Sequence, residues 1–299
     1  MKHQNFGIEI ELTGITRRDA AKVMANYFGT TEEYVGGTYR AYRVKDREGR
    51  IWKAVYDSSI HAETKQNGYA GDDYKCEIVS PICVYDDIET IQEIIRELRR
   101  KGAIANASCG IHVHIDAAPH TARSIKNISN IMASKEDLLF KALGVDGRRE
   151  HYCQKMDGRF VHRINARSIH SKDDIMKIWY NGEAYRSGRH YDESRYHALN
   201  LHSVWQKGTI EFRMFNGTTH AGKIKAYIQL CLAISHQAMT QSCASSRKTV
   251  TSNERFTFRT WLLRLGLIGD EFKTARTHLL ANLDGDTAFR HGRPERAAA

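Results

Sequence analysis

Three short segments of the chain alternate strictly between apolar and polar residues, which is the pattern of a β-strand that buries one face. They are residues 6–12, 110–116 and 209–215. The side chains predicted on their polar faces are Glu9, Glu11, His112, His114, Asp116, Thr209, Glu211 and Arg213. Any one of these segments alone could be an ordinary half-exposed strand. Side by side on one sheet, however, they would combine groups able to hold divalent cations and a phosphate chain.

The pattern elsewhere predicts helices and further strands around these three. Apolar residues at helical spacing predict helices at residues 17–28, 86–101, 124–133, 135–143, 172–180 and 220–243. Thr16 is the predicted N-cap of the first helix. Alternation bounded by turn residues predicts strands at residues 38–44, 50–56, 74–81 and 193–201, of which the first two form an antiparallel pair.

Two segments fall outside this pattern. Residues 144–191 are charged and mostly irregular, and we interpret them as a lid or a substrate-binding insertion. Residues 246–299 begin with a polar linker, continue with short helices at 256–265 and 271–283, and end in a tail expected to be disordered. We therefore predict a catalytic domain at residues 1–245, followed by a helical extension. The insertion contains histidines that lack metal-ligand spacing and are interpreted as surface or incidental residues: His151, His162, His170 and His190.

The composition is that of a folded, soluble protein. Hydrophobic residues make up 41% of the 299 residues, and the chain contains only 3 prolines and no low-complexity tract. Met1 is followed almost directly by a predicted strand, and no run of about 18 apolar residues occurs, so we expect no signal peptide and no membrane span. The 6 cysteines show no C-x-x-C spacing, which favours reduced thiols in the cytoplasm.

The chain is basic, with 45 lysines and arginines and a formal net charge of +10. Such a balance suits an anionic partner: a nucleotide, an acidic peptide, an anionic cell-wall precursor or a nucleic acid. The basic residues are spread along the chain and form no long arm, so nucleic-acid binding is the less favoured of these. Nothing in the sequence indicates an oligomeric state.

Three further residues carry chemistry beside the alternating strands. The predicted strand at 50–56 ends in Asp57-Ser58-Ser59, where both residue types are ordinary turn formers. Asp57 could nevertheless accept an amine, and Ser59 could position a carboxylate or a phosphate. Glu77 is the only carboxylate of the strand at 74–81 and is flanked by apolar residues, so it is either an edge-strand residue or a site residue.

The ordered set of these motifs resembles the amidoligase family, within the carboxylate–amine ligase superfamily of glutamine synthetase and γ-glutamylcysteine ligase. The resemblance spans roughly residues 5–240 and rests on residues 6–11, Asp57-x-Ser59, residues 77–81, 110–116 and 209–213. It implies an α+β fold with a curved, mostly antiparallel sheet of the glutamine synthetase and γ-glutamylcysteine ligase type. In that fold the sheet surrounds a nucleotide and helices pack behind it, and here a small helical cap would follow at the C-terminus.

The resemblance also implies metal ligands. Glu9, His112 and Glu211 would share one metal ion, while Glu77 would join Glu11 at another. Predominantly oxygen ligands favour Mg²⁺ or Mn²⁺ over zinc.

Other residues would contact the nucleotide and the substrates. Arg213 would lie on the transferred phosphate, and His114 near the nucleotide phosphates, with Ser59 a further candidate there. Arg195 and Asn200 would have phosphate or substrate roles.

The implied activity is an ATP- and Mg²⁺-dependent ligase that joins a small-molecule or peptide carboxylate to an amine through an acyl phosphate, forming an amide or isopeptide bond. Deprotonation of the amine could fall to Asp57 or Glu77. One alternative is a zinc-dependent hydrolase that uses the H-x-H strand with Glu211 or Asp116. Another is a basic nucleic-acid-binding protein with a degenerate site.

Overall fold

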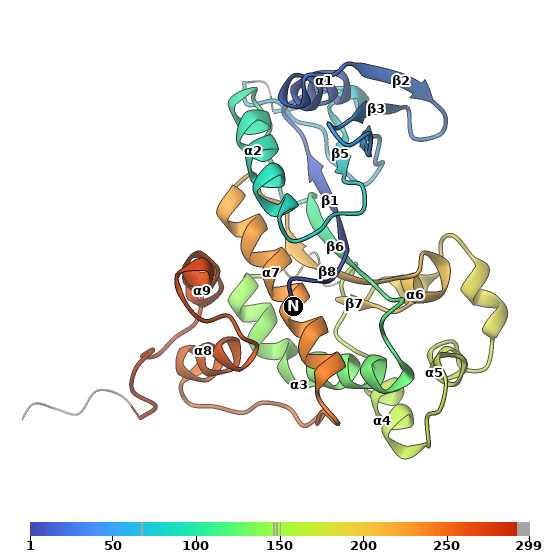
Figure 1. Ribbon diagram of the computed structural model, residues 1–299, viewed down its shortest axis with the longest axis vertical. Helices are drawn as coiled ribbons and strands as arrows, with labels where there is room; N and C mark the ends of the chain where they lie inside the picture. Colours follow the sequence, from blue (N-terminus) through green and yellow to red (C-terminus); the bar gives the residue numbers. More distant parts are fainter. Residues whose placement is uncertain (67, 146, 148, 150, 292–299) are drawn as a thin grey trace, which may run out of the picture.

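The computed structural model describes residues 1–66, 68–145, 147, 149 and 151–291. Over these residues the chain is an α+β protein with an open, antiparallel sheet (Figure 1). The strands are β1 (Phe6–Leu12), β2 (Glu32–Gly36), β3 (Ala41–Lys45), β4 (Ile51–Val55), β5 (Cys76–Val79), β6 (Gly110–Asp116), β7 (Leu199–Asn200) and β8 (Thr209–Asn216). Their order across the sheet is β2-β3-β4-β5-β1-β6-β8-β7. The three alternating strands β1, β6 and β8 are therefore neighbours, as the site requires.

Helices flank this sheet. The α-helices are α1 (Arg17–Phe28), α2 (Asp87–Arg100), α3 (Ala122–Leu143), α4 (Gly158–Ala166), α5 (Lys172–Trp179), α6 (His202–Gln206), α7 (Ala221–Thr240), α8 (Glu254–Arg264) and α9 (Lys273–Leu280). Short 3₁₀ turns lie at Asp72–Tyr74, Ala184–Gly188, Glu193–Arg195 and Asp270–Phe272. In Figure 1, α2 and α7 lie to the left of the central strands and α6 lies to their right.

The apolar face of the sheet forms the core against the helices. Ile8 and Ile10 of β1 and Val113 of β6 are at most 2% exposed. Phe215 of β8 stacks on Tyr227 of α7, with 4.3 Å between the ring centroids. The apolar positions read from the alternation are thus the core positions, and the polar positions lie on the opposite face.

Local signals set the ends of several helices. The Thr16 side chain accepts a hydrogen bond from the Asp19 N–H at the start of α1, which confirms the predicted N-cap. The same helix ends at Gly29, whose φ of 72° lies in the left-handed region that glycine adopts without strain. Thr121 and Ser124 form a capping box at the start of α3.

Some predicted elements differ from the structure. Residues 193–201 are mostly a turn and a loop, because Asp192 accepts a hydrogen bond from the Ser194 N–H and closes a 3₁₀ turn. Only Leu199–Asn200 pair with β8. The edge strand β2 carries no regular alternation and was not predicted from the sequence.

The two helices predicted on either side of Ser134 are one continuous helix, α3. Ser134 does not end the helix, because its hydroxyl donates to the Arg247 carbonyl in the segment that follows α7. The predicted C-terminal helices are confirmed as α8 and α9, and α9 packs on α7 (Figure 1). Of the tail expected to be disordered, residues 292–299 lie outside the described residues.

The segment at residues 144–191 is more regular than its composition suggested. It contains α4, α5 and the 3₁₀ turn at Ala184–Gly188. Ser171 caps the start of α5 in a capping box with Asp174. Within the described residues, no helix combines the length and the apolar character needed to cross a bilayer.

The helix α3 contains a buried carboxyl group whose ionisation should change the stability of the protein. Glu136 is 1% exposed, accepts the Met156 N–H at 2.6 Å, and has a pKa raised by burial to about 7. The folded protein therefore binds more protons than the unfolded chain between pH 4.5 and 7, and it loses stability as the pH rises through that range. Glu136→Gln stays neutral, so we expect it to exceed the wild type by on the order of 3 kcal/mol in unfolding free energy at pH 8.

Urea denaturation at several pH values measures this difference, which should shrink toward zero near pH 4.5. The control is Asp137→Asn at the next position, because the hydrogen bond from Lys155 lowers the pKa of Asp137. This variant should lose stability relative to the wild type at neutral pH. An advantage of Glu136→Gln that is the same at every pH would contradict the explanation by ionisation.

Candidate active site

Antiparallel pairing sets the polar faces of four adjacent strands against one another. β1 lies between β5 and β6, and β6 lies next to β8. The residues directly opposite each other are Glu11 and Glu77, Glu9 and His112, and His114 and Glu211. Residues from four separate parts of the sequence therefore meet at one place on the non-core face.

β8 contains a bulge within this site. Ile111 and Val113 of β6 pair with Phe215 and Phe212 of β8, so β8 has one extra residue between the two pairs. Both phenylalanines stay fully buried in the core. A bulge redirects the side chains beside it, and this bulge lies at Arg213. Strict alternation did not predict this feature.

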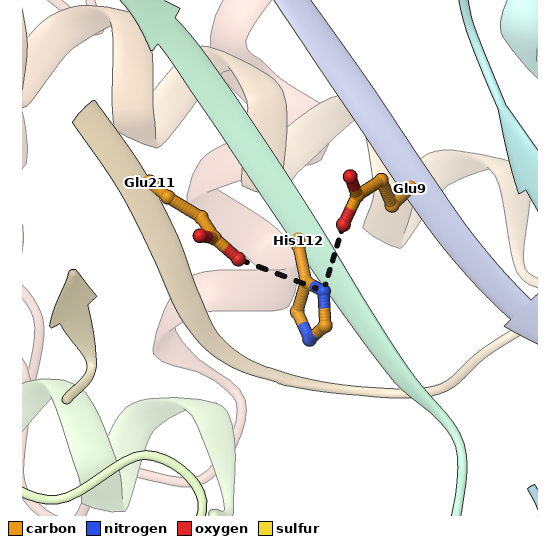
Figure 2. A group of neighbouring side chains, drawn as sticks. All are labelled: Glu9, His112 and Glu211. Atoms are coloured by element: carbon orange, nitrogen blue, oxygen red, sulfur yellow. Dashed lines mark hydrogen bonds and ion pairs between the residues drawn. The ribbon is translucent and has the colours of Figure 1, made fainter. Parts of the chain in front are cut away.

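One possible ligand group consists of Glu9, His112 and Glu211, which we call the first ligand group. Figure 2 shows these side chains converging from three adjacent strands. His112 Nδ1 lies 3.2 Å from Glu9 Oε2 and 3.7 Å from Glu211 Oε1. The ligand atoms of the group all lie within 4.8 Å of one another, close enough to bind one metal ion.

The second ligand group consists of Glu11, Glu77 and His112, whose ligand atoms also lie within 4.8 Å of one another. His112 Nε2 is 3.9 Å from Glu11 Oε1. The two ring nitrogens of His112 therefore face different groups: Nδ1 the first and Nε2 the second. The family resemblance implied the same pairing of carboxylates, with His112 in the first group only, whereas the structure places His112 between the two groups.

Electrostatics differ between the two groups. Burial opposes ionisation of Glu9, but His114 and His112 hold its pKa well below the ordinary value. Burial also opposes ionisation of Glu211, but Arg213 and the two histidines lower its pKa to about 2. The first group thus keeps its carboxylates charged despite their burial.

In the second group such compensation does not outweigh burial: His112, Arg149 and the Gly110 N–H lower the pKa of Glu11, and Lys207 lowers that of Glu77, yet both pKa values are raised. Burial raises the pKa of Glu77 well above the ordinary value, and the nearby Glu9, Glu11 and Asp57 raise it further. Burial also raises the pKa of Glu11. A divalent cation at this position would supply the missing positive charge and stabilise both carboxylates.

The donor set fits a hard divalent cation. Each group offers two carboxylates and one imidazole. Asn200 donates to Glu211 Oε2 at 2.6 Å, yet its own Oδ1 is buried without a hydrogen-bond partner among the described residues. His112 and His114 share no ligand group within the described part of the chain, which disfavours the zinc site expected for an H-x-H hydrolase.

A polar cavity of about 360 Å³ opens over both groups. Its lining includes the predicted residues Glu9, Glu11, Asp57, Glu77, His112, Arg195, Asn200, Glu211 and Arg213. Arg213 is buried and contacts Glu211. The guanidinium of Arg195 lies 5.5 Å from the ring centroid of Tyr191. The structure therefore gathers most of the predicted site residues around one space.

A more apolar cavity of about 370 Å³ lies beside the polar one. It is bordered by Gly7, Pro81, Ile82, His114 and Thr209. The Thr209 hydroxyl and His114 Nδ1 form a hydrogen bond of 2.9 Å. Both cavities are also lined by Glu9, Val79 and Lys207. His114 therefore belongs to the apolar cavity rather than to the polar one.

Ser59 does not line either cavity. Its side chain is exposed, and its N–H donates to Asp57 Oδ1 at 2.7 Å. The structure thus gives Ser59 the role of a turn former that orients Asp57, in place of the predicted contact with a carboxylate or phosphate.

Several lining residues were not identified from the sequence. Tyr39, in the turn between β2 and β3, has its hydroxyl 3.1 Å from His190 Nε2 and 3.3 Å from the Tyr191 hydroxyl. All three line the polar cavity, so His190 is exposed, as predicted, but it is not incidental to the cavity. Lys207 Nζ lies 3.3 Å from Glu9 Oε1. Only the tertiary contacts show that these residues belong to the site.

Arg149 is a further residue that the sequence did not single out. It is buried and donates to the Cys109 carbonyl at 2.6 Å and to the Arg213 carbonyl at 3.3 Å. Its guanidinium lies directly against Gly110, where a Cβ atom would be 2.7 Å from Arg149 Cζ. An added Cβ at the start of β6 would therefore displace the Arg149 guanidinium from the Arg213 carbonyl.

The fold and the site together define a sheet-based protein with two carboxylate–imidazole groups that line one polar cavity, with an apolar cavity beside it. The family model described as "putative amidoligase enzyme" matches residues 2–235. The chain belongs to this family, which confirms the resemblance seen in the motifs and assigns it to a family of ligases. The matched region contains every residue of both ligand groups, while α8 and α9 follow it. A search of curated proteins returns no match.

Proposed function

We propose that this protein is an ATP- and Mg²⁺-dependent carboxylate–amine ligase that forms an amide or isopeptide bond through an acyl phosphate. The observation that carries the proposal is the pair of ligand groups sharing His112, with Arg213 beside them. A hydrolase with one zinc ion would leave one of these groups without a role. Two cation groups and an arginine suit the charge of a triphosphate undergoing transfer.

The two groups would hold Mg²⁺ or Mn²⁺. Glu9, His112 and Glu211 would bind one ion, and Glu11 and Glu77 would bind another next to the same imidazole. Bound Mg²⁺ would neutralise phosphate oxygens and hold the transferred group in line. Both the fold and the activity of the protein would then be of the glutamine synthetase and γ-glutamylcysteine ligase type.

The cavities would divide the substrates. The apolar cavity, walled by Pro81 and Ile82, would take the nucleotide base, with His114 near the phosphates. The polar cavity, with Arg195 and Asn200, would take the carboxylate and the amine. Glu9 and Lys207 line both spaces and would lie where the phosphoryl group passes between them.

The proposed ligase reaction has two steps. A carboxylate oxygen attacks the γ-phosphorus of ATP, the bond to the β–γ bridging oxygen breaks, and ADP leaves. The amine then attacks the acyl carbon, inorganic phosphate leaves, and the nitrogen loses a proton. Arg213 would stabilise the charge on the transferred phosphoryl group in the first step.

Asp57 is the base that we propose for the second step. Glu77 belongs to the second ligand group, where a cation would occupy its carboxylate. Asp57 lines the same cavity outside both groups, and its carboxylate accepts only the Ser59 N–H among the hydrogen bonds of the described residues, while its backbone carbonyl accepts the Ile60 N–H. Its second carboxylate oxygen could therefore receive the proton of the amine. The 6 cysteines show no spacing of a disulfide framework, so we propose a cytoplasmic location for the activity.

Calorimetric titration tests the nucleotide site. A non-hydrolysable ATP analogue should bind the wild type in the presence of Mg²⁺, and binding should weaken at least tenfold in EDTA, because the phosphates need the cations to approach the carboxylates. Glu11→Gln should weaken Mg²⁺-dependent binding as well. The matched control Glu33→Gln removes the same charge from the exposed edge strand β2 and should bind as the wild type does. Failure of the wild type to bind would overturn the proposal.

A further inference from the structure

A separate cavity of about 290 Å³ lies between α4, α5 and the segment that contains Ser194 and His197. We call it the α4–α5 cavity. None of its lining residues belongs to the polar or the apolar cavity of the active site. Its size is at the lower end of the range for small-molecule sites in proteins.

Two buried polar atoms at this cavity have no hydrogen-bond partner within the described part of the chain. One is the indole nitrogen of Trp179, a residue that is only 8% exposed. The other is the hydroxyl oxygen of Ser194. An indole N–H can only donate, and a buried donor without an acceptor is unfavourable. Neither atom has accessible surface, so both lie behind the cavity wall, and an acceptor oxygen in the cavity would reach them only after a side-chain rotation.

Positive charge accompanies these donors. Arg159 and Arg163 line the cavity from the same face of α4, since they are four residues apart. Arg163 donates one N–H to Asn181, and Arg159 Nε is 3.8 Å from Asp157 Oδ1. Each guanidinium has five N–H donors, so most remain available to a ligand.

The cavity also has an aromatic wall. Phe160 and Trp179 pack edge to face, with 4.9 Å between ring centroids, and Trp179 packs edge to face on His197 at 5.3 Å. The His197 Nδ1 is 2.9 Å from the Lys155 carbonyl, so its N–H is already used there. Apolar ring surface therefore lies beside the group of donors.

We propose that the α4–α5 cavity is a binding site for a small organic anion, whose carboxylate or phosphate oxygens accept from Arg159 and Arg163. The aromatic wall would contact the remainder of the ligand. Ser194 and His197 flank Arg195, which lines the polar cavity of the active site. The ligand would thus bind the same short segment that carries Arg195. Binding of the anion would not require the ligase activity.

Titrations followed by NMR test this proposal on the whole chain. The 4 tryptophans give separate indole N–H signals, and that of Trp179 is assigned by backbone-directed experiments. Inorganic phosphate and benzoate, each added against sodium chloride of the same ionic strength, provide the tetrahedral and the planar oxyanion. We expect a saturable shift of the Trp179 signal with at least one of them at millimolar concentration, and the one that acts identifies the preferred anion.

Charge-removal variants localise the effect. Arg159→Gln combined with Arg163→Gln should weaken binding at least tenfold, whereas Arg167→Gln, an exposed arginine directly after α4, should leave it unchanged. If the double variant does not fold, Arg159→Gln alone replaces it, because that side chain is 93% exposed and not needed for folding. This single variant should weaken binding at least threefold. A shift that does not saturate, that is absent with both anions, or that is the same in these variants would overturn the proposal.

Discussion

Glu211→Gln is expected to lower ligase turnover by about 10²–10³-fold while the protein remains folded. The amide can still accept the N–H of Asn200, but it removes a charged oxygen from the first ligand group and the partner of Arg213. Turnover is measured as ADP release with hydroxylamine as a small amine and a panel of carboxylates. Electron paramagnetic resonance of Mn²⁺ measures the cation site separately, and we expect at least tenfold weaker binding.

The matched control is again Glu33→Gln on β2, which should retain both turnover and Mn²⁺ binding. Circular dichroism and urea denaturation establish that Glu211→Gln is folded, with a loss of roughly 1–3 kcal/mol expected because Arg213 stays buried without its partner. Undiminished Mn²⁺ binding in this variant would show that Glu211 is not a ligand. Wild-type turnover without any divalent cation would contradict the whole mechanism.

Gly110→Ala is expected to reduce turnover about 10²-fold, although residue 110 contacts no substrate in the proposed mechanism. Its Cβ would be 2.7 Å from Arg149 Cζ and would displace the guanidinium that donates to the Arg213 carbonyl. Overpacking of this kind should also cost roughly 1–3 kcal/mol of unfolding free energy. Urea denaturation and ADP release measure the two effects on the same preparation.

Gly71→Ala serves as the control, because an added Cβ there meets nothing within 4 Å. A double-mutant cycle with Arg149→Ala isolates the cause. If the clash with Arg149 is responsible, Gly110→Ala should have little further effect in the Arg149→Ala background. An equally large effect in both backgrounds would show that glycine is needed at this position for another reason.

Periodicity along the chain was sufficient to predict the two faces of the central strands. Ile8, Ile10 and Val113 are in the core, and Glu9 and His112 lie on the other face, as the alternation indicated. The reason is local: successive side chains of a strand point to opposite sides, so each residue's face is encoded by its neighbours. Helix ends such as the one capped by Thr16 were predictable for the same reason, because the capping contact spans three residues.

Irregular segments were predicted less well. Residues 193–201 have strand-like composition, yet the side chain of Asp192 closes a 3₁₀ turn that removes most of them from the sheet. The bulge at Arg213 also breaks the alternation without a sequence signal of its own. In both places a specific contact or a partner strand outweighed the local pattern.

The sequence by itself therefore determined the central strands, their faces, most of the helices and the family, together with the carboxylates and histidines that could bind metal. The tertiary structure decided how these residues are combined: it divides them into two groups around His112, and it brings Tyr39, His190 and Lys207 to the cavity. It also places Arg149 against Gly110. Faces follow from backbone geometry between adjacent residues, whereas such contacts depend on strand register and loop packing between residues far apart in sequence, which no local pattern records.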